Sequence, residues 1–169
     1  MRELVVATKN IKKLAEIKAL LKDMDLKIIS LSAYPKTPRI IENGKTFADN
    51  AIKKATVIAR FTGKLTLGED SGLCVDALGG KPGVYSSRFA GKNKSDCANN
   101  RKLLKVLEGL GQRERRAHYA CAVALADSSG LIAVVEGSCA GVIGFKQEGH
   151  FGFGYDPLFL IPRYGKTFA

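Results

Sequence analysis

The first 22 residues change from strand-like to helix-like spacing within a few positions, and this change constrains the fold more than any other feature. Residues 3–7 form a short apolar run, and Thr8-Lys9-Asn10 interrupts it. From Ile11 onward, apolar residues recur at helical spacing, namely Leu14, Ile17, Leu20 and Leu21. Asn10 is a favourable N-cap residue. The pattern therefore predicts a strand, a tight turn and a helix in close succession.

The turn at this predicted helix start is rich in lysine. Lys9, Lys12 and Lys13 surround an N-terminus whose free N–H groups and dipole favour an anion. The sequence is not a Walker A motif, because Gly-x-x-x-x-Gly-Lys-[Ser/Thr] is missing. Two interpretations remain open here: a phosphate-binding turn, or a solvated lysine face.

A second strand is expected at residues 26–31, and a second helix after the loop that carries Glu42. Thr46 and Asp49 have the spacing of a capping box, and the helix is expected to run to about Phe61. Its buried stripe is predicted to consist of Phe47, Ala51, Ala55, Ile58 and Ala59. Lys53 and Lys54 are expected to project away from most of that stripe.

The stretch from Gly68 to Gly91 holds the most telling polar residues. A predicted strand ends at Leu67, and two carboxylates, Glu69 and Asp70, precede the small pair Ser71-Gly72, which favours a tight turn. Carboxylates at a strand end suit a divalent cation or the activation of water. A plain surface turn explains the same residues, since turn residues recur in any loop.

The middle of the chain continues the alternation of strands and helices. Another strand is predicted at residues 73–78, and Arg88 follows a turn-rich loop as a possible phosphate contact. Ser95 is expected to cap a helix with Leu103, Leu104, Leu107 and Leu110 on its core side. Residues 117–126 and 131–136 flank Asp127-Ser128-Ser129-Gly130, which predicts a hairpin.

The stretch from His150 to Pro162, HFGFGYDPLFLIP, interleaves glycines with aromatic rings. A ring on such a loop can stack on a nucleobase, and a neighbouring carboxylate or backbone group can bind the base edge. An aromatic ring that fills the core is the alternative explanation.

The charge balance points to a negatively charged partner, or else to a basic surface that serves only solubility. The net charge is +11, from 27 basic and 16 acidic residues, which suits nucleic acid, a phosphorylated metabolite or an acidic membrane surface. The basic residues are scattered without interleaved aromatics, so nucleic acid is the less favoured partner.

The cysteines and the hydropathy indicate the compartment. The four cysteines have no Cys-x-x-Cys pair, and the chain has only two histidines, so zinc-site spacing is absent. Reduced thiols in a cytoplasmic protein are expected. The acidic residue at position 3 argues against a signal peptide, and no run reaches the ~18 apolar residues of a membrane span.

Four segments, in order, resemble the Ham1-type inosine triphosphate pyrophosphatases, the house-cleaning enzymes for non-standard purine triphosphates. They are ATKNIKKLAEI, ENGKTFADNAIKKA, EDSGLCVDALGGKPGVYSSRFAG and GFGYDPLF, spread over nearly the whole chain. The resemblance implies an α/β fold, with an elongated mixed sheet flanked by helices and two lobes around a central cleft. It also implies a homodimer and Mg²⁺-dependent hydrolysis of ITP, dITP and XTP to the monophosphate and pyrophosphate.

The resemblance also assigns roles to individual residues. Asp70 would be the general base and, with Glu42, a magnesium ligand; Glu69 is an alternative ligand. The residues that would bind substrate are Thr8, Lys9, Asn10, Ile11, Lys12, Lys13, Lys54, Ser71, Arg88, Phe153, Gly154, Tyr155 and Asp156.

The chain departs from the family pattern in two places. It ends at YGKTFA, where family members continue into a further helix and a Ser-His-Arg segment that helps to hold the base. A single family-like domain over residues 1–169 that lacks this segment is therefore expected. Lys9 also stands where many relatives carry glycine. Two alternatives to the enzyme remain: a truncated homologue that binds nucleotide with little activity, and a basic nucleic-acid-binding module.

Overall fold

The computed structural model describes residues 2–93 and 95–169. The strands are β1 (Arg2–Val6), β2 (Leu26–Ser30), β3 (Thr66–Val75), β4 (Arg116–Asp127), β5 (Gly130–Ile143), β6 (Phe159–Ile161) and β7 (Lys166–Thr167). The α-helices are α1 (Ile11–Leu20), α2 (Phe47–Thr62) and α3 (Asp96–Val106). Short 3₁₀ turns are η1 (Leu31–Ala33), η2 (Asp76–Leu78), η3 (Gly83–Arg88) and η4 (Gln112–Glu114).

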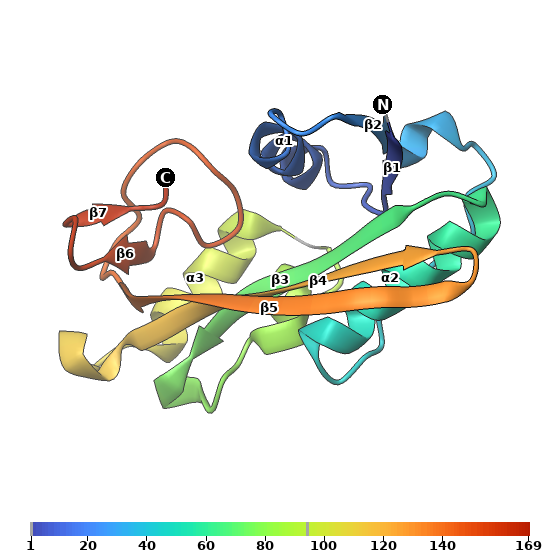
Figure 1. Ribbon diagram of the computed structural model, residues 1–169. Coiled ribbons are helices and arrows are strands. Elements are labelled where there is room, and N and C mark those ends of the chain that lie inside the picture. Colours follow the sequence, from blue (N-terminus) through green and yellow to red (C-terminus); the bar gives the residue numbers. More distant parts are fainter. Residues whose placement is uncertain (1, 94) are drawn as a thin grey trace. The chain divides into compact units, whose positions relative to one another are not determined.

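In the described part of the chain the strands form one seven-stranded sheet in the order β2-β1-β3-β4-β5-β6-β7 (Figure 1). β1 is parallel to both β2 and β3, whereas β6 is antiparallel to β5 and β7. Parallel neighbours need crossover connections, and α1 and α2 supply them. The predicted mixed sheet with flanking helices is confirmed. The two lobes and their cleft stay a prediction.

The chain divides into two compact units. The first unit comprises residues 1–70 and 121–137, and the second comprises residues 71–120 and 138–169. β3, β4 and β5 each contribute residues to both units.

In the first unit, α2 packs on the sheet through alanines. Ala51, Ala55 and Ala59 are fully buried against the alternate alanines 122, 124 and 126 of β4. Small side chains on both elements let the helix approach the strand closely. The predicted capping box at Thr46 and Asp49 is confirmed. The predicted stripe of α2 is confirmed except that Phe47 is only half-buried.

The predicted helix after the turn is confirmed as α1, although no residue of it is buried and Leu20 is 82% exposed. Its N-terminus is as expected, since the Asn10 side chain accepts hydrogen bonds from the backbone N–H groups of Lys12 and Lys13. Leu14 and Ile17 of α1 are half-buried.

The second unit has its own core. Leu103 and Leu107, on and just after α3, are fully buried with Leu73 and Val75 of β3, and Phe159 of β6 joins them. Among the described residues, no helix is both long enough and apolar enough to cross a membrane.

Candidate active site

Asp70 lies in the middle of a strand, not after the end of one. β3 runs without a break from Thr66 to Val75 through Glu-Asp-Ser-Gly, so the predicted turn at Ser71-Gly72 and the separate strand at 73–78 are both wrong. Gly68 allows this segment of β3 to pack closely against the backbone of α2. A Cβ atom at position 68 would lie 2.3 Å from the carbonyl oxygen of Ala51. The glycine thus serves close helix packing.

The Asp70 carboxylate is buried and held at both oxygens. Lys54 Nζ lies 2.9 Å from Asp70 Oδ1, and Asn50 Nδ2 donates to Asp70 Oδ2 at 2.9 Å. Lys54 is 8% exposed and Asp70 is 7% exposed. Burial lowers the pKa of the Lys54 ammonium, but attraction to Asp70 and then to Glu42 outweighs it, so the pKa of Lys54 is raised. Lys54 is therefore a charged ammonium at neutral pH.

Lys54 also reaches Glu42. Its Nζ lies 3.2 Å from Glu42 Oε2, and the Glu42 side chain is 42% exposed. One ammonium thus joins two carboxylates, one on β3 and one on the loop before α2. The expectation that Lys54 projects away from the buried stripe is wrong, because a carboxylate partner satisfies its charge inside the protein.

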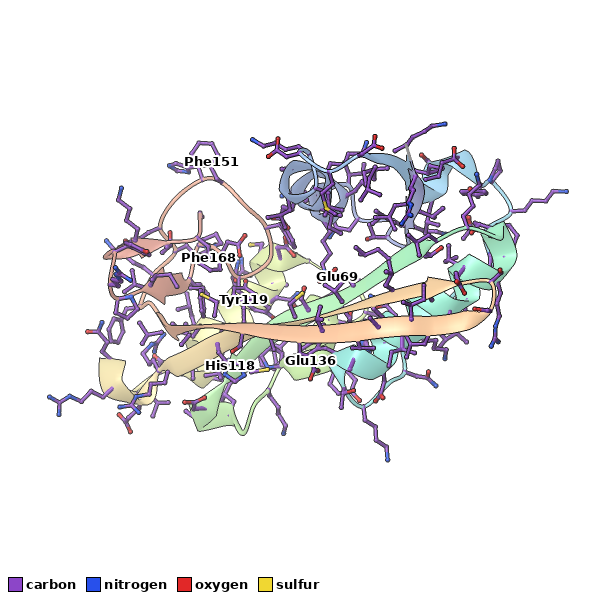
Figure 2. The ribbon with its side chains drawn as sticks, in the orientation of Figure 1. Glu69, His118, Tyr119, Glu136, Phe151 and Phe168 are labelled. Carbon is purple, nitrogen blue, oxygen red and sulfur yellow. The ribbon has the colours of Figure 1, made fainter. Side chains whose placement is uncertain are left out.

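A second ion pair involves Glu69, the residue before Asp70. Lys13 Nζ lies 2.8 Å from Glu69 Oε2 and donates to Oε1 at 3.0 Å. Successive side chains leave a strand on opposite faces, and the contacts agree: Asp70 meets α2, whereas Glu69 reaches towards α1 (Figure 2). Lys13 and Lys54 therefore neutralise neighbouring carboxylates from two different helices.

Cys121 of β4 lies beside this second pair. Its Sγ is 3.6 Å from Glu69 Oε1, and burial followed by the charge of Glu69 raises the pKa of the thiol to about 11. Cys121 is therefore a neutral thiol near neutral pH. Across the described residues, all four cysteines are free, namely Cys74, Cys97, Cys121 and Cys139.

The remaining predicted phosphate-binding residues of the first unit surround the start of α1. Lys9, Asn10, Ile11 and Lys12 are exposed, and Thr8 and Lys13 are half-buried. Thr8 Oγ1 accepts a hydrogen bond from the backbone N–H of Asn10 at 3.1 Å, which fixes the turn. Of these lysines, Lys13 contacts the carboxylate of Glu69. The phosphate role of the whole turn stays a prediction.

In the second unit, Ser71 and Arg88 belong to β3 and η3. Arg88 ends η3 and is half-buried, with its guanidinium 4.9 Å from the centre of the Tyr85 ring. Ser86 in the same turn binds β3, because its Oγ accepts the N–H of Leu73 at 2.9 Å. The phosphate contacts expected of Ser71 and Arg88 stay predictions.

The aromatic loop is held from several sides within the second unit. Asp156 Oδ2 accepts the N–H of Phe153 at 2.8 Å, and Asp156 Oδ1 accepts the hydroxyl of Tyr119 at 3.0 Å. From α3, Asp96 accepts the N–H of Gly154, and Asn100 donates to its carbonyl oxygen. Gly154 has φ of 62°, a left-handed conformation that suits glycine. The loop conformation is thus defined by its neighbours.

The four predicted base-binding residues of this loop differ in their surroundings. Tyr155 is 3% exposed, belongs to the core and donates its hydroxyl to the carbonyl of Ser86 at 2.8 Å, so it fills the core. Phe153 is half-buried, whereas Phe151 is 81% exposed (Figure 2). Of the three rings in this loop, Phe151 and Phe153 therefore have surface available to a ligand, and only Phe153 belongs to the predicted set.

The sequence analysis missed four polar residues: Asn50, which contacts Asp70, and Asp96, Asn100 and Tyr119, which hold the aromatic loop. Asn50 precedes Lys54 by four residues, and this spacing places both on one helix face. That signal was available in the sequence. The other three act on a loop far away in the chain, and nothing local indicates their partners.

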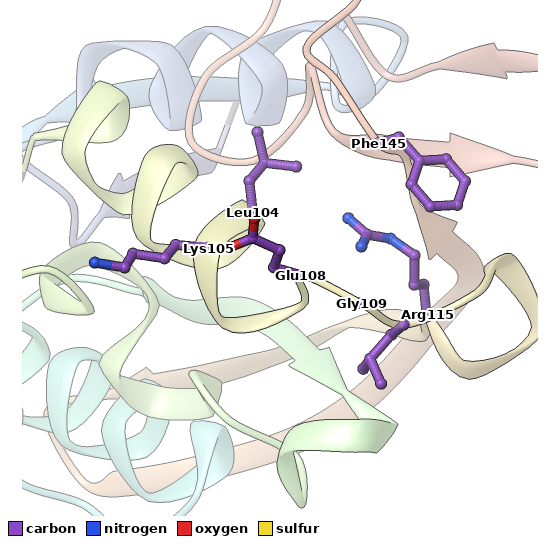
Figure 3. A pocket seen from close by; sticks show the side chains of 7 residues that line it. Leu104, Lys105, Glu108, Gly109, Arg115 and Phe145 are labelled. Atoms are coloured by element: carbon purple, nitrogen blue, oxygen red, sulfur yellow. The ribbon is translucent and has the colours of Figure 1, made fainter.

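A pocket of about 360 Å³ lies elsewhere in the second unit and contains none of the predicted site residues. In it the Arg115 guanidinium lies 4.6 Å from the centre of the Phe145 ring (Figure 3). Arg115 donates to the carbonyl oxygens of Leu107, Ile143 and Gly144 at 2.7–2.9 Å. It therefore caps the end of α3, a structural role that favourably places a cation at a helix C-terminus.

The donor atoms beside Lys54 suit a hard divalent cation. Asp70 and Glu42 offer carboxylate oxygens, which such ions prefer, and they already converge on one positive charge. Within residues 2–93 and 95–169, no group of three or more His, Cys, Asp or Glu residues forms a metal site. A site with two carboxylates fits an ion that takes its other ligands from phosphate and water.

Comparison with known proteins places the chain in a family. It is 53% identical over 167 residues to the dITP/XTP pyrophosphatase of Desulforamulus reducens, covering 99% of this chain and 83% of the relative. It is 49% identical to that of Geobacter sulfurreducens, over 100% of this chain and 85% of the relative.

Solved structures agree. A HAM1 protein from Coxiella burnetii matches with a TM-score of 0.89 and 40% identity, over 100% of this chain and 86% of the other. The Staphylococcus aureus Ham1 protein matches with a TM-score of 0.87 and 38% identity, over 99% and 85%. The model of the Ham1 family matches residues 4–169. The chain belongs to the Ham1 family.

Proposed function

We propose that this chain hydrolyses non-canonical purine nucleoside triphosphates (dITP, ITP and XTP) to the monophosphate and pyrophosphate. The observation that carries the proposal is the buried ion pair of Asp70 and Lys54, which the more exposed Glu42 joins, in a chain 53% identical to a dITP/XTP pyrophosphatase. The activity would remove such nucleotides from the pool.

Asp70 is the general base in this proposal. It accepts a proton from a water molecule as the water oxygen bonds to the α-phosphorus, and the bond between that phosphorus and the α,β-bridging oxygen breaks. Pyrophosphate leaves, and the products are the nucleoside monophosphate and the protonated carboxyl group. Lys54 holds Asp70 Oδ1 at 2.9 Å and so keeps the carboxylate in place for the step.

A divalent ion, which we propose to be Mg²⁺, would be held by Asp70 and Glu42 and would neutralise part of the triphosphate charge. Lys13 and the turn at residues 8–12 would hold the phosphate chain, with Arg88 and Ser71 as further contacts. For the base, Phe153 would supply ring surface, and the backbone of residues 153–156 would contact the purine edge. A site with a donor for the 6-oxo group rejects a 6-amino purine, because its polar groups are then left unpaired.

Two further features belong to the proposal. We place the enzyme in the cytoplasm, which four free cysteines support. We also propose a homodimer, as the family resemblance implies. Neither feature enters the chemical step.

The test is a pyrophosphate-release assay with ITP, XTP, ATP and GTP, with and without Mg²⁺. We expect release from ITP and XTP that needs Mg²⁺, and much less from ATP and GTP. Thermal stabilisation by ITP with Mg²⁺ but no turnover would instead identify a nucleotide-binding homologue. Steeply salt-dependent binding to oligonucleotides, with no pyrophosphate release, would support the nucleic-acid alternative.

The bond that breaks can be tested separately. Hydrolysis in ¹⁸O-labelled water should place the label in the monophosphate. Label found only in pyrophosphate would overturn attack at the α-phosphorus.

A further inference from the structure

Asn50 is a buried polar residue whose side-chain amide both donates and accepts a hydrogen bond. It is 2% exposed, its Nδ2 donates to Asp70 Oδ2 at 2.9 Å, and its Oδ1 accepts the backbone N–H of Gly44 at 2.8 Å. Only one orientation of the amide satisfies both contacts. The reverse would place an oxygen against the carboxylate and an NH₂ group against an N–H. The orientation of Asn50 is therefore fixed.

Asn50 and Lys54 act together on one carboxylate. They lie four residues apart on α2, and each donates to a different oxygen of Asp70. Two donors from one rigid helix define the plane of the carboxylate more tightly than a single ion pair does. Asn50 does so without adding a second positive charge.

The other end of the amide holds the loop that carries Glu42. Gly44 packs directly on this turn of α2, since a Cβ atom there would lie 2.7 Å from Asn50 Oδ1 and 2.6 Å from Asp49 Cβ. Glu42, two residues earlier, reaches Lys54 from the same loop. Asn50 thus contacts the strand and the loop that supply the two carboxylates of the site.

We propose that Asn50 is a positioning residue of the reaction: it orients the Asp70 carboxylate and fixes the Glu42 loop beside it. The inference rests on the proposed function for its role in turnover. It extends that function to a residue that contacts neither the phosphates nor the base in the proposed mechanism. Residues that orient the ligands of a metal site change metal affinity or activity by about 10–100-fold when they are replaced.

The experiment replaces Asn50 with leucine, which matches its shape but has no polar atoms, and with serine, which leaves room for water. For ITP hydrolysis, we expect kcat to fall about 10–100-fold in Asn50→Leu, with KM for ITP changed less than about threefold. Asn50→Ser should keep more activity, because a hydroxyl or a water can donate to Asp70. Mn²⁺ alone, titrated calorimetrically without nucleotide, should bind about tenfold or more weakly to Asn50→Leu than to the wild type.

Asp49→Asn is the matched control. Asp49 lies on the same turn of α2 and accepts the backbone N–H groups of Lys45 and Thr46, so its replacement weakens the helix start but not the contact to Asp70. We expect a lower melting temperature with kcat within about twofold of wild type. If Asn50→Leu does not give the native circular dichroism spectrum, Asn50→Ser is judged by the same two readouts.

The outcomes separate the two proposals. If the wild type releases no pyrophosphate from ITP or XTP, the proposed function fails, and Mn²⁺ binding alone judges Asn50. If the wild type is active and folded Asn50 variants keep wild-type kcat and Mn²⁺ affinity, the positioning role is overturned. It is also overturned if their losses match those of Asp49→Asn, since Asn50 would then only stabilise the fold.

Discussion

The polar residues of the first unit and those of the aromatic loop in the second unit are held by different means. In the first unit, opposite charges meet: the buried Lys54 joins the buried Asp70 and the exposed Glu42, and the half-buried Lys13 joins Glu69. In the second unit, the loop at residues 151–156 is held by hydrogen bonds to its backbone and by the hydroxyl of Tyr119. The first arrangement suits the stabilisation of charge during a reaction, and the second suits the fixed shape of a binding surface.

The largest effect is expected at Asp70. Asp70→Asn keeps the size and the contact to Asn50 but removes the proton acceptor, so turnover of ITP should fall by about 10²–10⁴-fold. The far-ultraviolet circular dichroism spectrum should stay native. Turnover within about twofold of wild type would place the base elsewhere and break the comparison.

Lys54→Met tests whether the buried charges depend on one another. Removing one partner of a buried ion pair leaves an uncompensated charge, so the free energy of unfolding should fall by about 3 kcal/mol. Urea unfolding measures the change. Lys53→Met is the matched control, because Lys53 is half-buried and donates to the neutral Asn43 side chain at 2.7 Å. Its effect should stay below about 1 kcal/mol.

Tyr119→Phe tests the second unit. The variant loses the hydrogen bond to Asp156 but keeps the ring that stacks on Phe168, with centroids 5.7 Å apart (Figure 2). A hydrogen bond to a charged group contributes about 1.5 kcal/mol, or about tenfold in binding. KM for ITP should therefore rise by up to about tenfold with kcat little changed. A loss in kcat alone would show that this loop takes part in chemistry.

The smallest effect is expected at Glu3, a partly exposed carboxylate of the first unit. Hydrogen bonds from Lys64 and then from Lys27 lower the pKa of Glu3 to about 2. Because the folded pKa lies below the unfolded value, the stabilisation is present above about pH 4.5 and is lost as the pH falls towards 2.

Glu3→Gln should therefore lower stability slightly at pH 6 and not at all near pH 2, as measured by urea unfolding across this range. The change at pH 6 should be far smaller than that of Lys54→Met, since exposed ion pairs contribute little. An equal loss of unfolding free energy in the two variants would show that the buried ion pair stabilises the fold no more than the more exposed one does.

Local sequence signals predicted much of the first unit. The capping box at Thr46 and Asp49 and the stripe of α2 follow from spacing alone, and both are confirmed apart from the half-buried Phe47. Spacing failed for Lys54, because a lysine outside an apolar stripe is normally solvated. Lys54 is buried because Asp70, a carboxylate on the distant strand β3, compensates its positive charge.

The same limit applies to β3 and to the aromatic loop. Asp70-Ser71-Gly72 has the composition of a turn, and pairing with neighbouring strands overrides that preference. In the loop, the motif suggested one shared role for residues 153–156, but Tyr155 lies in the core. Ring orientation depends on the packing of distant elements, which a local pattern does not contain.

Gly68 has a practical consequence for engineering. A glycine in the middle of a strand is an obvious candidate for replacement by valine or threonine, because it weakens the strand. At position 68 a larger residue would meet the backbone of α2 and force the helix outward. Lys54 would then move relative to Asp70. A substitution chosen to raise the stability of the protein would thus lower its activity.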